Sequence, residues 1–212
     1  MTDITIIGSG NMARAIGTRA VAAGREVQIL DRTPDNAAKL AAELGGNTTS
    51  GGLEEVPAGD IVVVALYFGP AKEVATHFGD TLSGKIVIEI SNPVNTETFD
   101  SLVVEPGTSA AEQIAALLPG ALVVKAFNTT FAGPLTAGSA GGLSLDVFIA
   151  SDSEQARNDV AAFAAAAGLR PLQVGGLHHA RELEGLELLI MALQINPAYE
   201  SFNWGTSLKI ID

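Results

Sequence analysis

The sequence predicts an α/β protein with a Rossmann-type, doubly wound, mostly parallel sheet and a small C-terminal helical cap. A short β-branched apolar run at residues 4–7 stops at Gly8, and a helical pattern follows at once. Further apolar runs then alternate with helical patterns along the chain, which is the rhythm of parallel strands joined by crossover helices. Residues 61–66 are apolar throughout, as expected of a strand covered on both faces.

The elements follow from this alternation in chain order. We predict strands at 4–7, 26–30, 61–66, 85–90, 121–126, 145–150 and 170–174. We predict helices after Gly10 and at 36–44, 71–78, 108–118, 153–167 and 178–194. Residues 203–211 are expected to add an edge strand, and residues 138–142 form a glycine-rich loop.

Length and composition limit the classes of protein. At 212 residues the chain is long enough for one domain with an appendage. We predict an NAD(P)-binding Rossmann domain at residues 1–175. A C-terminal helix and tail at 176–212 then close the cleft or form a dimer surface. The leucines and the isoleucine within residues 183–193 make an apolar stripe along one side of a helix. This stripe either packs on the chain's own sheet or is the contact surface of a homodimer.

Charge and cysteine content exclude several partners. The formal net charge of −12 argues against nucleic acid, which needs a basic footprint. The sequence contains no cysteine, so disulfides and thiol catalysis are excluded. No apolar run approaches the roughly 20 residues that cross a bilayer. We therefore expect a cytoplasmic protein with no membrane partner.

The glycine-rich turn after the first strand predicts dinucleotide binding. Gly8 permits a sharp turn, Gly10 lets the backbone approach a pyrophosphate, and the small Ala13 allows close packing of helix on strand. The helix that follows points its free N–H groups at the phosphates. Asp31 ends the second strand about 20 residues on, where an acidic residue meets the adenosine ribose.

The loops at the carboxyl ends of the strands predict one active-site crevice. Residues 8–12, 67–70, 91–93 and 127–132 converge there in a doubly wound sheet. Hydride transfer needs two rings held close together in a site that excludes water, and the cofactor carries the chemistry. The loops offer aromatic and small groups, so no side chain is predicted to be catalytic in itself.

Each candidate in these loops also has a structural interpretation. Tyr67 and Phe68 are either cleft or core residues. Asn92 and Asn128 either bind a carboxamide or belong to a turn and a cap. Lys125 is either a general acid or, more commonly, a lysine that reaches solvent or an acidic neighbour.

A histidine pair in the C-terminal segment does not predict a metal site. His178 and His179 are adjacent, and neighbouring residues of an α-helix point about 100° apart. We expect them at a helix start, with Glu182, Glu184 and Glu187 on its solvated side.

Four stretches together resemble the family of coenzyme F420-dependent NADP oxidoreductases. They are residues 6–13, 64–70, 89–93 and 124–132, and the resemblance covers nearly the whole chain. The family implies that the nicotinamide lies near residues 130–132 and that a deazaflavin ring stacks on it. The resemblance and the crevice together give these cofactor-binding residues: Gly8, Ser9, Gly10, Asn11, Met12, Asp31, Arg32, Thr33, Leu66, Tyr67, Asn92, Pro93, Asn128, Thr130 and Ala132.

The sequence departs from the family at the end of the second strand. The family has a serine followed by one or two arginines there, whereas this chain has Asp31, Arg32 and Thr33. An aspartate accepts the ribose 2′-OH of NAD, and an arginine pairs with the 2′-phosphate of NADP. We expect NADP, with NAD as the alternative.

The predicted function is hydride transfer between NADP(H) and a second ring cofactor, most favourably coenzyme F420. The alternatives are an NADPH-dependent flavin or ferric reductase and a non-catalytic dinucleotide sensor. An imine or β-hydroxyacid reductase ranks lower, because fewer than about 40 residues follow Val174, short of the helical domain such enzymes use.

Overall fold

The computed structural model describes residues 3–211, so the outermost residues of the two predicted domains, 1–2 and 212, lie outside it. The strands are β1 (Ile4–Ile7), β2 (Val27–Leu30), β3 (Thr49–Gly51), β4 (Ile61–Val64), β5 (Ile86–Glu89), β6 (Leu122–Ala126), β7 (Ser139–Ala140), β8 (Leu143–Ser144), β9 (Asp146–Ala150) and β10 (Arg170–Gly175). The helices are α1 (Asn11–Ala22), α2 (Pro34–Leu44), α3 (Phe68–Phe78), α4 (Ala110–Leu117), α5 (Ala132–Ala137), α6 (Glu154–Ala166) and α7 (Ala180–Ile195). Short 3₁₀ turns, η1 (Gly79–Leu82) and η2 (Leu177–His179), precede β5 and α7.

The main sheet confirms the predicted doubly wound α/β fold. Its strand order is β10-β9-β6-β5-β4-β1-β2-β3. Every neighbouring pair is parallel except β6 and β9, which are antiparallel. The chain order reverses beside β1, and the loops after β1 and β4 meet there, which is where ligands bind in such sheets.

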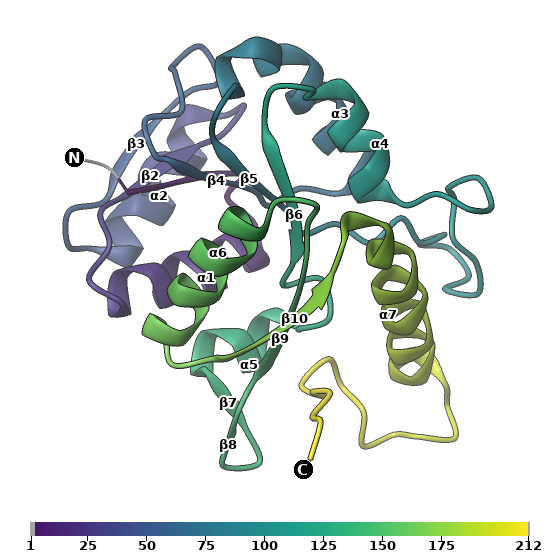
Figure 1. Ribbon diagram of the computed structural model, residues 1–212. Coiled ribbons are helices and arrows are strands. Elements are labelled where there is room, and N and C mark those ends of the chain that lie inside the picture. Colours follow the sequence, from purple (N-terminus) through teal and green to yellow (C-terminus); the bar gives the residue numbers. More distant parts are fainter. Residues whose placement is uncertain (1–2, 212) are drawn as a thin grey trace.

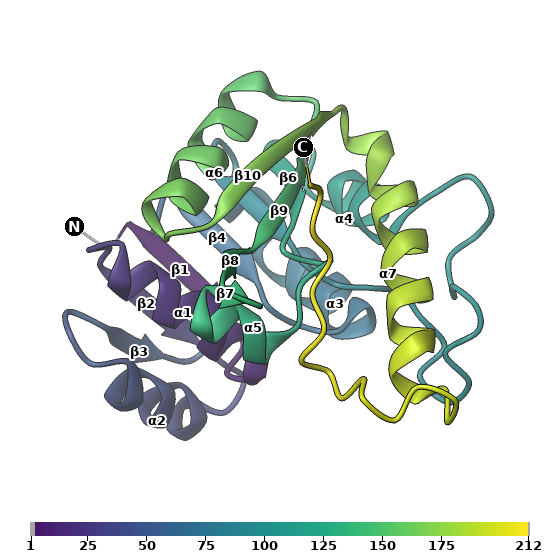
Figure 2. The same ribbon diagram turned by 90° about the horizontal axis from the view of Figure 1, so that it is seen from below.

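Helices cover both faces of the sheet (Figures 1 and 2). Alternate residues of each central strand enter opposite cores: Ile6 and Val63 pack with α1, α2 and α6, whereas Ile7 and Val64 pack with α3 and α4. This explains the apolar runs without alternation, because a strand buried on both faces needs apolar side chains on both.

Local sequence signals fix several helix boundaries. Ser109 accepts a hydrogen bond from the amide N–H of Glu112 (3.1 Å) at the start of α4, and its hydroxyl donates to the Glu112 carboxylate (2.8 Å). This is a capping box. Ser153 caps α6 in the same way through the amide N–H of Ala156 (3.2 Å). Pro34 begins α2, where a missing N–H costs nothing.

The C-terminal tail is not the edge strand that we predicted. Its contact with the β6–α5 loop is an isolated bridge between Thr130 and Ser207. The tail is held instead by side chains, since both Lys209 and the amide N–H of Ile210 bind the carboxylate of Asp146 (2.5 and 2.8 Å). Figure 2 shows the tail running back from α7 toward β9 and β10.

Three short elements were missed from the sequence. They are the edge strand β3, the short helix α5 and the β7–β8 hairpin, which occupies part of the predicted glycine-rich loop. All are short, and β3 and the hairpin lack apolar runs, so periodicity carries little signal there. Within residues 3–211 no helix combines the length and the apolar character that crossing a bilayer requires.

Candidate active site

The glycine turn after β1 has the geometry of a phosphate-binding loop. Gly8 adopts a φ of +115°, and a Cβ placed on it would lie 2.6 Å from the carbonyl oxygen of Ala65. Only glycine allows β1 and β4 to approach so closely here. A Cβ on Gly10 would meet nothing within 4 Å. The first turn of α1 has no acidic residue and no side-chain cap, so its N–H groups remain available to an anion.

A hollow of about 390 Å³ opens beside this loop at the end of β2. Gly8, Asp31, Arg32, Thr33 and Leu66 of the predicted site line it, so the structure brings these five residues together. Pro70, from the predicted loop at residues 67–70, also lines it, whereas Asn36, Leu53, Glu73 and His77 were not predicted. They come from α2, α3 and the β3–β4 loop, so no single stretch of sequence marks them.

Asp31 is oriented by two donors at the mouth of the hollow. The hydroxyl of Ser9 donates to one carboxylate oxygen (2.7 Å) and the amide N–H of Thr33 donates to the other (2.8 Å). A carboxylate has room for further donors, so Asp31 can still accept a ribose hydroxyl. Arg32 is exposed and has no ion pair in the described part of the chain.

The predicted nicotinamide loops meet at the carboxyl ends of β5 and β6. The amide of Asn128 donates to the side-chain oxygen of Asn92 (3.0 Å) and to the carbonyl of Leu183 on α7 (3.1 Å). Asn92 in turn donates to the carbonyl of Asn128 (2.9 Å). Thr130 is buried, and its hydroxyl donates to the carbonyl of Phe127 (3.0 Å). The two asparagines thus join both loops to α7.

The remaining predicted residues divide by exposure. Tyr67 is 79% exposed, which excludes the core interpretation for its side chain. Pro93 is buried, whereas Met12 and Ala132 are half-buried at the starts of α1 and α5. Asn11 is exposed, and its side-chain oxygen accepts a hydrogen bond from Arg14 (3.2 Å).

Lys125 pairs with acidic neighbours, so the general-acid interpretation of this residue is wrong. Its ammonium is fully buried and donates to Glu89 (2.6 Å), Glu184 (2.8 Å) and the carbonyl of Ser91 (2.5 Å). Burial opposes the charge on Lys125, but Glu89 and Glu184 together hold its pKa above the usual value. All three ammonium hydrogens are therefore occupied.

Glu184 also joins α7 to α4. Its carboxylate accepts the amide N–H groups of Ala110 (3.0 Å) and Ala111 (3.4 Å) in the first turn of α4. A carboxylate at this position is favoured by the helix dipole. Burial nevertheless raises the pKa of Glu184.

One expectation about this segment is corrected and another is confirmed. Glu184 and Glu187 lie in the interior, not on the solvated side of α7, and Glu182 alone of the three is exposed. His178 and His179 lie at the helix start, in the 3₁₀ turn that leads directly into α7, and their rings are 4.1 Å apart. Across residues 3–211 no group of three or more potential metal ligands is found.

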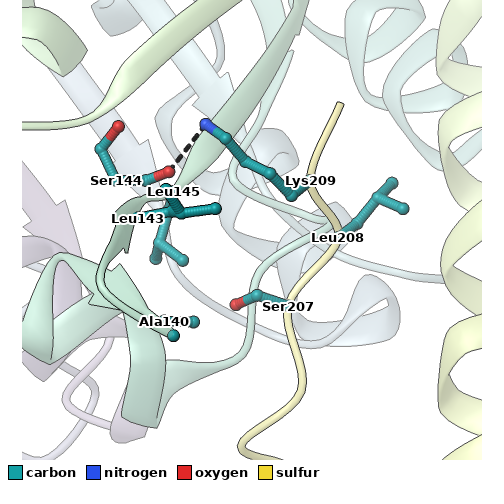
Figure 3. A pocket seen from close by; sticks show the side chains of 8 residues that line it. Ala140, Leu143, Ser144, Leu145, Ser207, Leu208 and Lys209 are labelled. Carbon is teal, nitrogen blue, oxygen red and sulfur yellow. Dashed lines mark hydrogen bonds between the residues drawn. The ribbon is translucent and has the colours of Figure 1, made fainter. Parts of the chain in front are cut away.

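A second hollow, of about 230 Å³, lies between the β7–β8 hairpin and the tail (Figure 3). Its lining includes Leu143, Leu145, Ser207 and Lys209, but no residue of the predicted site. Lys209 is occupied by the carbonyl of Ser144 (2.9 Å) and by Asp146. The chemistry that the sequence predicts is therefore assigned to the glycine turn and its neighbours.

Comparison with known proteins points to the N-terminal part of the chain, which contains the glycine turn. Residues 3–93 match the family model of coenzyme F420-dependent NADP oxidoreductases. The rat metalloreductase STEAP3 is 34% identical over 188 residues, which span 89% of this chain and 37% of that protein. The F420-dependent NADP reductase of Methanothermobacter thermautotrophicus is 28% identical over 210 residues, covering 92% and 90% of the two chains.

The fold extends this similarity to nearly the full length. An Arthrobacter protein assigned as an F420-dependent NADP reductase superposes with a TM-score of 0.81 at 24% identity, covering 96% of this chain and 97% of that one. The chain spans only 37–39% of the metalloreductase relatives. The resemblance predicted from the sequence is confirmed: residues 3–93 match the model of the coenzyme F420-dependent NADP oxidoreductases, and most of the chain is similar to F420-dependent NADP reductases at 28% identity.

Proposed function

We propose that the protein transfers a hydride between NADP(H) and a second ring cofactor, most favourably coenzyme F420. The observation that carries this proposal is the pairing of two sites along one edge of the sheet. The glycine turn and the Asp31–Arg32 hollow form one end, and the asparagine-linked loops after β5 and β6 form the other. A dinucleotide that lies across the edge would place its two halves at these ends.

The residues present fit NADP. The N–H groups of α1 would bind the pyrophosphate, while Gly8 and Gly10 permit its close approach. Asp31 would accept a ribose hydroxyl. The free guanidinium of Arg32 would pair with a 2′-phosphate, and NAD is the alternative because Asp31 also suits a 2′-OH.

The chain's contribution to the reaction is position and exclusion of water. NADP(H) supplies or accepts the hydride at its nicotinamide ring. Asn92 and Asn128 would orient the ring's carboxamide, and the buried Phe127 and Phe131 would provide an apolar wall. Holding two rings in contact distance supplies most of what a direct hydride transfer needs from a protein.

The identity of the acceptor rests on the relatives. The archaeal relatives are F420-dependent NADP reductases, and they align with most of this chain. The metalloreductases have higher identity but are much longer, so their reaction comes to this chain only as an alternative in which a flavin or ferric ion accepts electrons.

Oligomeric state and location are also part of the proposal. Leu189 is 63% exposed on the outer face of α7, and Ile195, Tyr199 and Trp204 follow with large exposed areas. A surface of this kind favours coverage by a second copy. We propose a homodimer that acts in the cytoplasm, and light scattering on the purified protein would contradict the dimer if it gave the monomer mass.

The experiment that tests the function has two steps. Calorimetric titration with NADPH and NADH comes first, and we expect saturation with NADPH bound more tightly. Oxidation of NADPH is then followed with coenzyme F420, FMN and ferric chelates as separate acceptors. Turnover with F420 supports the proposal, whereas turnover with FMN or iron alone selects the alternative. Tight binding without any turnover would indicate a dinucleotide sensor.

A further inference from the structure

Helix α7 buries a carboxyl group, that of Glu187, for which the described part of the chain offers no partner. Glu187 is 1% exposed, and its Oε1 has no hydrogen bond to any described residue. Burial raises the pKa of Glu187 to about 8. The group therefore carries its proton at neutral pH and is able to donate it, unlike an ordinary surface glutamate.

The position of Glu187 along α7 places it at the carboxyl edge of the sheet. Leu183 and Glu184, one turn earlier on the same face, contact Asn128, Lys125 and the first turn of α4. Each residue advances a helix by about 1.5 Å, so Glu187 lies roughly 4.5–6 Å further along the axis. The helix then runs toward the β6–α5 loop, because Gln194 near its end accepts a hydrogen bond from the amide N–H of Trp204 (3.0 Å), and the Trp204 ring lies 5.3 Å from the ring of Phe131.

Those loops carry unpaired polar atoms of their own. The hydroxyls of Ser91 and Thr129 and the side-chain oxygen of Asn128 are buried, and none has a hydrogen-bond partner within residues 3–211. Buried polar atoms normally form hydrogen bonds, and a buried polar atom without a hydrogen bond destabilises the fold. Ser91 follows β5, Asn128 and Thr129 follow β6, and Asn128 contacts α7 one turn before Glu187, so a polar ligand that reaches these loops would meet atoms that still lack a partner.

The charged groups nearby do not stabilise the ionised form of Glu187. Glu184 lies one turn before Glu187 on the same face of α7. It pairs with Lys125 of β6, which also pairs with Glu89 of β5. Lys125 has no donor left, because its three hydrogens are used within the cluster. On α4, Glu112 pairs with Arg181 at the surface. No cation among these groups is available to hold Glu187 as a carboxylate.

We propose that Glu187 supplies the proton that accompanies the hydride to an organic ring acceptor. This inference rests on the proposed function. The C–H bond of the reduced nicotinamide breaks and a C–H bond forms on the acceptor, so that NADPH is oxidised and the acceptor reduced. Glu187 gives its proton to a ring nitrogen or oxygen of the acceptor and regains one from solvent. A ferric ion takes only an electron, so its reduction would not need Glu187.

The test compares Glu187→Gln with Glu182→Gln, a control on the exposed face of the same helix. We expect the wild-type rate of F420 reduction by NADPH to fall above pH 8, tenfold per pH unit. In E187Q the rate should be lower by roughly 10²–10⁴-fold, as for loss of a general acid, and the fall near pH 8 should vanish. E182Q should keep the wild-type profile. NADPH affinity measured by calorimetry should not change in either variant.

A second readout is independent of activity. The pKa of Glu187 is higher in the folded protein than in the unfolded chain, where it is near 4.5. The contribution of this group to the free energy of unfolding is fully present below pH 4.5 and is lost as the pH rises toward 8. Urea unfolding of wild type should show that loss, and E187Q should lack it. If E187Q does not fold, a wild-type rate that stays flat from pH 6.5 to 9.5 overturns the inference.

The two proposals fail in different ways. A protein that binds NADPH but reduces no acceptor overturns the proposed function and the proton donor with it. A protein that reduces F420 equally well with Gln at this position overturns the proton donor alone. Reduction of ferric chelates only, unaffected by E187Q, also overturns the role of Glu187.

Discussion

The two ends of the site are built in opposite ways. At the end near β2 the glycine turn, Asp31 and Arg32 come from one short piece of chain, residues 8–33, although α2, α3 and the β3–β4 loop complete the hollow, and Asp31 and Arg32 remain at least partly exposed. The end near β6 joins β5, β6, α4 and α7 through the fully buried ions Lys125, Glu89 and Glu184. Substitutions at the first end should therefore change ligand binding, whereas those at the second should change folding first.

The largest expected effect is at the buried end. Lys125→Met removes the cation that pairs with two buried carboxylates, Glu89 and Glu184, and breaking such a pair from one side costs about 3–5 kcal/mol. Urea unfolding at pH 7 measures the loss. Lys39→Met, an exposed lysine on α2, is the control and should change stability by less than about 0.5 kcal/mol.

A companion variant sharpens this result. Adding Glu184→Gln to Lys125→Met removes one uncompensated charge and should recover part of the lost stability. Equal stability of wild type and the single variant would show that the ion cluster is not what holds α7 to the sheet.

The next effect concerns selectivity at the exposed end. Arg32→Ala would remove the proposed charge-assisted contact with the 2′-phosphate, of about 1.5–3 kcal/mol, which corresponds to roughly 10–150-fold weaker NADPH binding. NADH lacks the 2′-phosphate, so its affinity should hardly change. Calorimetry with both nucleotides decides, and an equal loss for the two would contradict the role of Arg32. Tighter binding of NADH than NADPH by wild type would reverse the predicted preference.

Substitutions at the two glycines of the turn should have different effects, one on the stability of the fold and the other on dinucleotide binding. Gly8→Ala forces a Cβ against the Ala65 carbonyl at a φ of +115°, and such strain costs about 1–3 kcal/mol. Gly10 has a φ of −78° and open space, so Gly10→Ala should leave the free energy of unfolding unchanged or slightly higher. Its Cβ should nevertheless weaken dinucleotide binding. Unaltered NADPH affinity in Gly10→Ala would argue against a pyrophosphate at this turn.

The same contrast explains what could be predicted from the sequence. The glycine turn and Asp31 are close in sequence, and their spacing is set by one strand, one helix and the next strand. The ion cluster joins residues 89, 125 and 184, and no local pattern connects them. A signal was present on α7, since Glu184 and Glu187 interrupt a run of apolar residues one turn apart. We assigned both to the solvent side because charged residues are rarely buried without a partner.

Helix α7 carries both a buried and an exposed ion pair, because Arg181 pairs at the surface and Glu184 in the interior. It binds Glu112 of α4 through two hydrogen bonds (2.5 and 2.9 Å), so it joins α7 to α4 as Glu184 does, but at the surface. Arg181→Met should therefore destabilise far less than Lys125→Met, because water and salt screen the exposed pair.

The pH dependence of Arg181→Met identifies the interaction. Hydrogen bonding to Arg181 holds the pKa of Glu112 below its usual 4.5. A carboxyl whose pKa is lowered by folding contributes stability above its unfolded pKa, and that contribution is lost as pH falls through the folded value. The small difference between wild type and Arg181→Met should thus be present at pH 7 and shrink on acidification below 4.5, as measured by urea unfolding at both pH values. A difference that persists in acid would mean that Arg181 acts through the packing of its alkyl chain, and surface charge would then have no part in holding α7 against α4.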